Sequence, residues 1–212
     1  MAYVFDPNVL QEIVTTVLGQ PMPVLVQSLR AELETRYPGH VFPSTEWVFS
    51  NAGGAMGHFT ILHASLREYI IVFGTPIGTE GHTGRYLSDD YFYILEGEQW
   101  AYSEGELTRR VYRPGDCHVL PRGHAEGWSM PGHAYAMEYA RGVIPAMLPF
   151  GLADAFTSTL DYPSIAKTFR LYTQAVVREM IHGTRVDGQR RAASSAKVTR
   201  ASAAVSRNIT AP

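Results

Sequence analysis

The sequence predicts an α+β fold in which an antiparallel β-structure carries helices at both ends. Residues 41–142 consist of short apolar runs separated by Gly and Pro, and at least six of these runs have the length of a strand. Residues 1–40 and 143–182 instead place apolar residues at helical spacing. Several short strands with turn residues between them are typical of an antiparallel barrel or sandwich. We therefore expect one structural domain with a central β-barrel and flanking helices.

The N-terminal region is predicted to contain two helices. The first covers residues 6–20, because Asp6 is a typical cap residue, Pro7 suits the first turn, and apolar residues recur on one face. The second is expected from about residue 23 to 37, with leucines on one face and Gly39 after its end. We expect residues 1–40 to pack on the β-barrel of residues 41–142 through these apolar faces.

The C-terminal region is predicted to contain two further helices and a tail. The segment "VIPAMLPFGLADAFTST" is apolar on nearly every side, and residues 163–182 oppose an apolar stripe with Lys and Arg. Such a segment is compatible with a core helix pair, with a cover for a partner-binding groove or with a contact to a membrane surface. The Lys and Arg residues opposite the apolar stripe favour the membrane contact, so residues 143–185 are predicted to face a membrane. Residues 186–212 lack large apolar side chains and are predicted to be disordered.

The composition is that of a globular protein with extra apolar surface. The chain has 212 residues, a hydrophobic content of 45% and a charged content of 18%. A formal charge of -2 gives no electrostatic basis for binding nucleic acid, and the single Cys117 excludes an internal disulfide or a cysteine-based zinc cluster. No segment reaches the ~18 apolar residues of a spanning helix, and the N-terminus lacks a secretory signal pattern. We expect a chain that stays in the cytosol or on a membrane face.

The segment "RPGDCHVLPRGHAEGW" resembles the second half of the cupin signature, which belongs to a small jelly-roll barrel. A cupin metal site usually combines a His-x-His pair and a Glu with one further His. No His-x-His occurs here, although His118 and His124 lie in the cupin-like segment, and His58 and His63 are five residues apart. We therefore expect a cupin-like barrel without a metal, and we interpret His63 as a core or interface residue.

Three acidic residues stand out by their positions on predicted strands. In "HAYAMEYARG", strand alternation places Glu138 on the face of Ala134 and Ala136, among small apolar neighbours. In "YLSDDYF", Asp89 and Asp90 are adjacent, so their side chains point to opposite faces and only one can enter the barrel. The alternation favours Asp90, and Asp89 remains an alternative; both are also compatible with a solvated turn.

The motifs "NAGG", "LHASLREY", "FGTPIGTEGHTGRY" and "ARGVIP" resemble the family of fungal sterol C-8 isomerases and sigma receptors, over roughly residues 3–182. "DDYFYIL" and "AMLPFG" are closer to the isomerase branch. The resemblance implies a cupin-like barrel around a narrow hydrophobic chamber, whose mouth is covered by two C-terminal helices on a membrane surface, and association as trimers. We expect peripheral or monotopic association with the endoplasmic reticulum membrane, without an N-terminal transmembrane helix.

The resemblance also implies an activity and its acids. In ergosterol-type biosynthesis the isomerase moves a sterol double bond from the 8,9 to the 7,8 position by protonation and deprotonation, which needs no cofactor. Two carboxyl groups in an apolar chamber suit this chemistry, because desolvation and mutual repulsion keep one of them protonated. Glu138 stands in the family's "EY-x-RG" strand at the position of the essential acid, and Asp90 or Asp89 is the expected partner.

Six further residues align with the lining of the family's ligand chamber. They share an aromatic or aliphatic side chain, and each is equally compatible with ordinary barrel core. They are Tyr69, Ile71, Phe73, Tyr86, Phe59 and Met130. The hydroxyl group of Tyr69 can hydrogen-bond a carboxylate in such a chamber.

Two other functions remain open from the sequence. One is isomerisation or cyclisation of another polycyclic terpenoid in specialised metabolism by the same acids. The other is binding of cationic amines or sterols without turnover, as in a sigma receptor, with Glu138 pairing with the amine.

Overall fold

The computed structural model describes residues 3–183, which begin with two helices that pack on the β-structure. These are α1 (Pro7–Val17) and α2 (Met22–Arg36), and both agree with the predicted helices to within a few residues. The Asp6 side chain accepts a hydrogen bond from the backbone N–H of Asn8, which caps α1 as expected.

The middle of the chain forms ten strands. They are β1 (Trp47–Ala52), β2 (Ala55–Ala64), β3 (Glu68–Thr75), β4 (Thr79–His82), β5 (Ser88–Glu96), β6 (Gln99–Ser103), β7 (Arg110–Tyr112), β8 (Cys117–Leu120), β9 (Glu126–Met130) and β10 (Ala134–Gly142). They pair antiparallel in two sheets, a six-stranded sheet with the order β1-β2-β3-β10-β5-β8 and a four-stranded sheet with the order β4-β9-β6-β7. The predicted α+β class and jelly-roll character are confirmed, and the strands form two sheets instead of one closed barrel.

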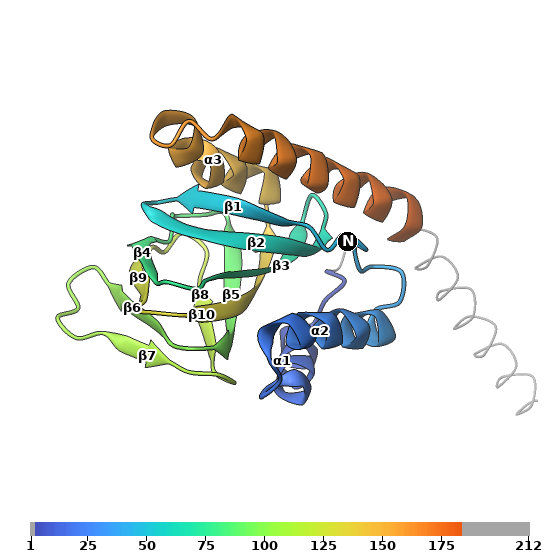
Figure 1. Cartoon of the computed structure of the whole chain (residues 1–212), viewed down its shortest axis with the longest axis horizontal. Helices are drawn as coiled ribbons and strands as arrows, with labels where there is room; N and C mark the ends of the chain where they lie inside the picture. The colour runs from blue at the N-terminus through green and yellow to red at the C-terminus, as the bar shows by residue number, and fades with distance from the viewer. Residues whose placement is uncertain (1–2, 184–212) are drawn as a thin grey trace, which may run out of the picture.

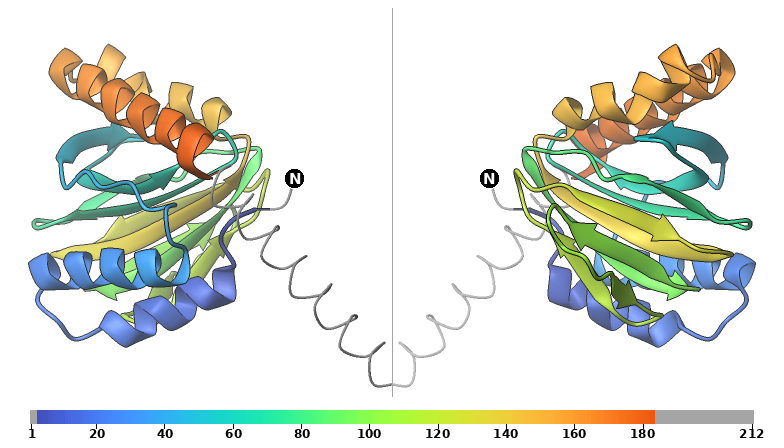
Figure 2. Two further views of the ribbon diagram at one scale, coloured as in Figure 1. Left: turned by 90° about the vertical axis from the view of Figure 1, so that its right-hand side faces the viewer. Right: turned by 90° about the vertical axis from the view of Figure 1, so that its left-hand side faces the viewer.

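The C-terminal part of the described chain is helical. A short 3-10 helix, η1 (Ile144–Met147), leads into α3 (Leu148–Thr157), and a longer helix covers residues 162–183. Figures 1 and 2 show α3 and the longer helix on one side of the β-structure, with α1 and α2 on the opposite side. Within residues 3–183, no helix has both the length and the apolar composition needed to cross a membrane.

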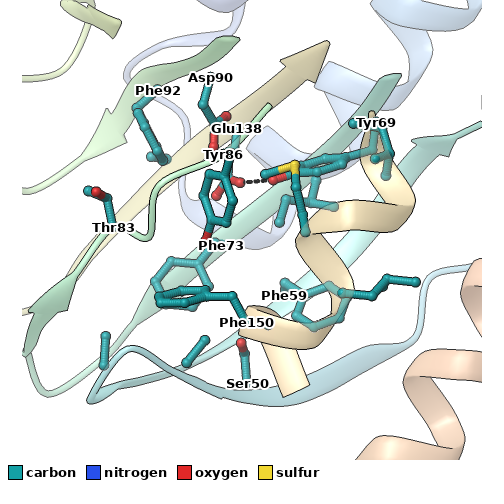
Figure 3. Close-up of a pocket in the computed structure, with 18 of the residues that line it drawn as sticks. Ser50, Phe59, Tyr69, Phe73, Thr83, Tyr86, Asp90, Phe92, Glu138 and Phe150 are labelled. Carbon is teal, nitrogen blue, oxygen red and sulfur yellow. Dashed lines mark hydrogen bonds between the residues drawn. The ribbon is translucent and has the colours of Figure 1, made fainter. Parts of the chain in front are cut away.

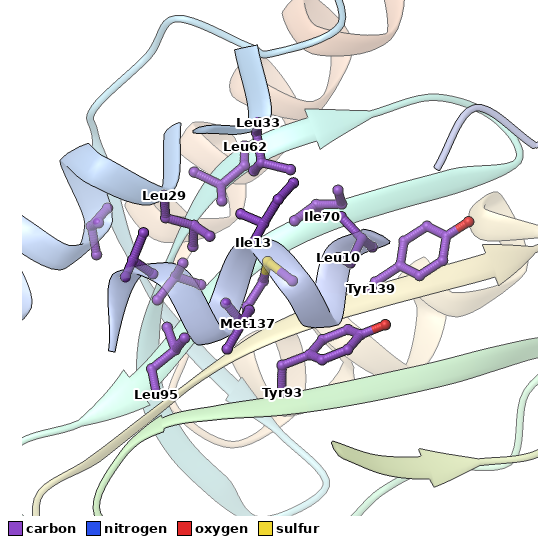
Figure 4. Close-up of a cluster of buried hydrophobic side chains, with 14 of the residues drawn as sticks. Leu10, Ile13, Leu29, Leu33, Leu62, Ile70, Tyr93, Leu95, Met137 and Tyr139 are labelled. Carbon is purple, nitrogen blue, oxygen red and sulfur yellow. The ribbon is translucent and has the colours of Figure 1, made fainter. Parts of the chain in front are cut away.

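The main core lies between the two N-terminal helices and one face of the six-stranded sheet. Leu10 and Ile13 of α1 pack with Met137 and Tyr139 of β10, and all four are at most 1% exposed (Figure 4). Because successive residues of a strand point to opposite faces, Ala136, Glu138 and Ala140 are directed to the other face of the sheet. The alternation of β10 therefore turns Glu138 away from this core.

The long C-terminal helix has its own contacts with the sheet. Leu171, Ala175 and Val176 pack with Val48 of β1 and Ile61 of β2. This packing fixes the helix over the side of the sheet that does not carry α1 and α2. The predicted tail at 186–212 lies outside the described residues, and the division of the chain at residues 40, 142 and 185 stays a prediction.

Candidate active site

A cavity of about 210 Å³ lies between the inner face of the six-stranded sheet, the four-stranded sheet and the C-terminal helices. Leu148 and Phe150 of α3 and Tyr172 of the long helix contribute to its wall. All six of the predicted lining residues border it, namely Tyr69, Ile71, Phe73, Tyr86, Phe59 and Met130. Figure 3 shows the aromatic rings of this lining around two carboxyl groups.

The two carboxyl groups belong to Asp90 of β5 and Glu138 of β10. These strands are antiparallel neighbours, with Glu138 opposite Phe92 and Ala140 opposite Asp90. Asp90 and Glu138 are thus diagonal neighbours on one face of the sheet, a relation in which long side chains can touch. Asp90 is 2% exposed, and both carboxyl groups border the cavity.

The acids are hydrogen-bonded to each other and to a tyrosine. The hydroxyl of Tyr69 donates to Oε1 of Glu138 (Figure 3), and the side chains of Asp90 and Glu138 also form a hydrogen bond. Two carboxyl groups can share a hydrogen bond only when one of them carries a proton. Neither acid forms an ion pair with Lys or Arg within the part of the chain that the structure describes.

Burial is the main reason why both acids resist ionisation. Burial raises the pKa of Asp90 well above its ordinary value, and the neighbouring Glu138 raises it further. Burial also raises the pKa of Glu138, although the hydrogen bonds from Tyr69 and Asp90 oppose this shift. The pair therefore titrates as a unit and keeps a proton at a pH where an ordinary carboxyl group has lost it.

The structure does not bring Asp89 into the cavity. Its Oδ1 accepts a hydrogen bond from the backbone N–H of Arg122, and its Oδ2 lies 3.8 Å from Nε of Arg141. Nη2 of Arg141 donates in turn to the hydroxyl of Tyr91. Arg141 is thus held on the face of the sheet opposite Glu138, as its odd spacing from that residue predicts.

The histidines considered for a metal site are held apart by other contacts. Nδ1 of His63 lies 2.8 Å from the carbonyl oxygen of His40 in the protein interior, and Nε2 of His58 lies 2.9 Å from the hydroxyl of Tyr135. Among residues 3–183, no group of three or more His, Cys, Asp or Glu side chains is arranged to hold a metal ion.

Sequence reasoning missed part of the cavity wall. Phe92, Gln99 and Trp128 border the cavity. Phe92 shares the strand parity of Asp90, and this signal could have identified it. Gln99 and Trp128 lie in the four-stranded sheet, so their place depends on how the two sheets pack, which no local pattern reveals.

The chain is similar to proteins of one known family along most of its length. Residues 1–184 match the family model described as "ERG2 and Sigma1 receptor like protein". The chain is 47% identical over 184 residues to the C-8 sterol isomerase ERG2 of Gibberella zeae, which covers 85% of this chain and 78% of the relative. It is 48% identical over 183 residues to the C-8 sterol isomerase erg2 of Aspergillus fumigatus, covering 84% of this chain and 75% of the relative.

More distant similarities extend to a receptor and to a solved structure. The sigma non-opioid intracellular receptor 1 of Taricha granulosa is 37% identical over 180 residues, covering 84% of this chain and 81% of the receptor. An RmlC-like cupin from Shewanella frigidimarina superposes with a TM-score of 0.41 at 17% sequence identity, covering 49% of this chain and 89% of the cupin.

Proposed function

Because the chain belongs to the family of C-8 sterol isomerases and sigma-1 receptors, we propose that it is a sterol C-8 isomerase that moves the ring double bond from the 8,9 to the 7,8 position. The observation that carries this function is the pair of neighbouring carboxyl groups, Asp90 and Glu138, in an apolar cavity, where burial raises the pKa of both. The several fungal relatives named as C-8 sterol isomerases, at 43–49% identity, support the same substrate class.

The reaction needs one proton to be added and another to be removed. A proton from the Asp90–Glu138 pair adds to C9 of the sterol, and the electron pair of the 8,9 double bond forms the new C–H bond. A tertiary carbocation is left at C8. Loss of a proton from C7 then forms the 7,8 double bond, so that atoms and charge balance. The Asp90–Glu138 pair, which has given up its proton, is the base that accepts the proton from C7. These steps need no cofactor.

The surroundings of the pair suit this chemistry. The carboxyl pair becomes more negative when it donates its proton, and this charge lies in a site of low polarity where it stabilises the cation strongly. The Tyr69 hydroxyl holds Glu138 by a hydrogen bond and fixes the direction of its carboxyl group. The apolar lining excludes water, which would otherwise trap the cation as an alcohol.

The C-terminal helices offer a route between a bilayer and the cavity. Their exposed apolar side chains are Phe156, Leu160, Tyr162, Phe169, Val177, Met180 and Ile181. We propose that residues 143–182 contact the surface of the endoplasmic reticulum membrane and that the chain associates as a trimer. Vesicle flotation and light scattering of the purified protein test these two proposals separately.

The activity is tested by expressing the chain in a fungal cell that lacks sterol C-8 isomerase and profiling its sterols. Conversion of the accumulated 8,9 isomer to the 7,8 isomer is the expected result, with Glu138→Gln as the inactive control. Unchanged accumulation with well-expressed protein would reject the sterol assignment. Amine binding without turnover, or turnover of another terpenoid only, would then identify the receptor function or the other terpenoid function.

A further inference from the structure

One buried polar atom in the cavity wall has no role in the proton transfer. Gln99 of β6 is 2% exposed and borders the cavity, and its Oε1 is buried without a hydrogen-bond partner among the described residues. A buried acceptor that stays unsatisfied costs roughly 1–3 kcal/mol. Such an atom in a ligand cavity indicates a donor that arrives with the ligand.

The other end of the Gln99 amide is fixed by a chain of buried contacts. Nε2 of Gln99 lies 3.2 Å from Nδ1 of His118, and Nε2 of His118 lies 2.7 Å from Oε2 of Glu126. The remaining Glu126 oxygen lies 2.8 Å from Nη2 of Arg110, which places a positive charge at the end of the chain. His118 is also held by its ring contact with Tyr112, at 4.5 Å between centroids and an interplanar angle of 11°.

The contacts assign the protons along this chain. Hydrogen bonds from His118 and Arg110 outweigh the effect of burial and lower the pKa of Glu126 to about 2, so Glu126 is a carboxylate at neutral pH. A nitrogen 2.7 Å from a carboxylate oxygen must carry the proton between them. The amide nitrogen of Gln99 is a donor and lies 3.2 Å from Nδ1 of His118, so Nδ1 accepts this hydrogen bond and the ring proton is on Nε2, towards Glu126. This leaves Oε1 of Gln99 as an acceptor without a partner among the described residues, on a side chain that borders the cavity.

His118, which contacts the Gln99 amide, lies at a distance from the acids that suits a sterol. His118 pairs with Phe92, which is two residues along β5 from Asp90 and shares its face. At about 3.4 Å per residue, His118 stands about 7 Å along the strand from Asp90. The 3-hydroxyl of a sterol is on ring A and the reacting carbons C8 and C9 are in the adjacent ring B, a separation on the same scale.

We propose that Gln99 anchors the substrate, with Oε1 accepting a hydrogen bond from the 3-hydroxyl group of the sterol. Glu126 and His118 act as positioning residues that fix the orientation of the Gln99 amide. This inference rests on the proposed function for the identity of the ligand. It adds that the cavity selects a free alcohol over a ketone of the same shape, because a ketone oxygen would face another acceptor.

Binding of two saturated sterols tests the anchor without turnover. The probes are 5α-cholestan-3β-ol and 5α-cholestan-3-one, which lack the ring double bond and therefore do not react. We expect the wild-type protein to bind the alcohol roughly 5- to 150-fold more tightly, the factor that corresponds to leaving a buried acceptor unsatisfied. Equal binding of the two probes, or binding of neither, would overturn the inference.

A variant and a spectroscopic measurement assign the selectivity to Gln99. Gln99→Met keeps the length of the side chain and removes the acceptor, so the ratio of the two affinities is expected to fall towards one. Met130→Leu, in the apolar wall, is the matched control and should change the affinity for both probes alike. A Gln99→Met ratio equal to that of the wild type contradicts the anchor.

If Gln99→Met does not fold, the ratio measured on the wild-type protein still decides, together with the tautomer of His118 from its ¹⁵N NMR signals. The Nε2–H form is expected, and the Nδ1–H form contradicts the orientation of the amide. Selective binding of the alcohol by a chain that isomerises no sterol would reject the proposed function and leave the anchor standing. Isomerisation of the sterol by a protein that binds the alcohol and the ketone equally would support the proposed function and reject the anchor.

Discussion

A single buried acid, Glu126, and a buried pair of acids, Asp90 and Glu138, lie in the same β-structure and differ in their partners. Glu126 contacts His118 and Arg110, and these contacts lower its pKa to about 2 despite its burial. Asp90 and Glu138 have each other and Tyr69 as partners, and burial raises the pKa of both. Burial alone therefore does not decide the charge of an acid in this protein.

The difference in charge between these acids suits two different roles, the orientation of a substrate and its protonation. A carboxylate that is paired with a cation keeps its charge and holds neighbours in place, which suits the orientation of Gln99. A carboxyl pair without a cation keeps a proton that it can give to an alkene. In the proposed function, Glu126 acts through His118 and Gln99 to orient the substrate, and the Asp90–Glu138 pair in the cavity protonates it.

The largest expected effect is that of Glu138→Gln on turnover. An amide of the same shape removes the carboxylate of the pair, so kcat is expected to fall by roughly 10³-fold, within the usual range for general acid–base groups. The fold should survive, because the substitution also removes a buried ionisable group. Steady-state assay of 8,9-sterol conversion and the circular dichroism spectrum check both parts. Wild-type turnover in a folded variant would contradict the role of Glu138.

The neighbours Asp90 and Asp89 offer a matched pair for the next effect. Asp90→Asn is expected to lower kcat by roughly 10²-fold, since the shared proton loses one of its carriers. Asp89→Asn changes an adjacent residue outside the cavity and should leave kcat within about two-fold, because a partly exposed ion pair is worth at most about 1 kcal/mol. Equal losses in the two variants would show that the side chains are not separated as described.

Glu126→Gln is expected to act on stability. The folded-state pKa of about 2 lies below the unfolded value of ~4.3, so the charge contributes stability above pH ~4.3 that is lost as the pH falls towards 2. The variant should be less stable than the wild type by roughly 2 kcal/mol at pH 7, and the difference should shrink in acid. Urea unfolding between pH 7 and pH 3 measures it, and a difference that is independent of pH contradicts the assignment.

Tyr69→Phe should reduce turnover about ten-fold, through the loss of one hydrogen bond to a charged group. The Tyr69 hydroxyl opposes the upward shift of the Glu138 pKa, so its removal should raise that pKa further. The alkaline limb of the pH–rate profile is then expected to move to higher pH. A smaller kcat with an unchanged profile would indicate that Tyr69 has only a packing role.

Asp90→Asn is also expected to change the free energy of unfolding. The raised folded-state pKa means that the folded protein resists the ionisation that the unfolded chain undergoes near pH 4, so Asp90 costs stability as the pH rises above that value. The stability of the variant relative to the wild type should therefore increase from pH 4 to pH 8. This trend is opposite to that of Glu126→Gln, and a trend of the same sign would break the comparison.

The local parts of the fold could be predicted from the sequence. Capping at Asp6 and apolar spacing located α1, and alternation along β10 placed Glu138 away from the helices that contact Met137 and Tyr139. The same alternation favoured Asp90 over Asp89. The division of the strands into two sheets was not predictable, because it depends on pairing between segments far apart in the chain.

Part of the candidate site could be predicted from the sequence. The positions of the acids and of six lining residues came from motifs resembling a known family, and the alternation supported Glu138 and Asp90. The contacts of Gln99, His118 and Glu126 join strands of both sheets, so no spacing in the sequence indicates them. For His118, the histidine pattern of a cupin suggests a metal ligand, and nothing in the sequence indicates its contacts with Gln99 and Glu126.

The protonation state of the Asp90–Glu138 pair at neutral pH tests the central claim most directly. Infrared difference spectra between the wild type and Asp90→Asn report the C=O stretch of a protonated carboxyl group in the absence of substrate. A protonated carboxyl band at pH 7 in the wild type, altered in Asp90→Asn and unchanged in Asp89→Asn, is the result we predict. Two ionised carboxylates at pH 7 would contradict the account, because the cavity would then hold no proton to give.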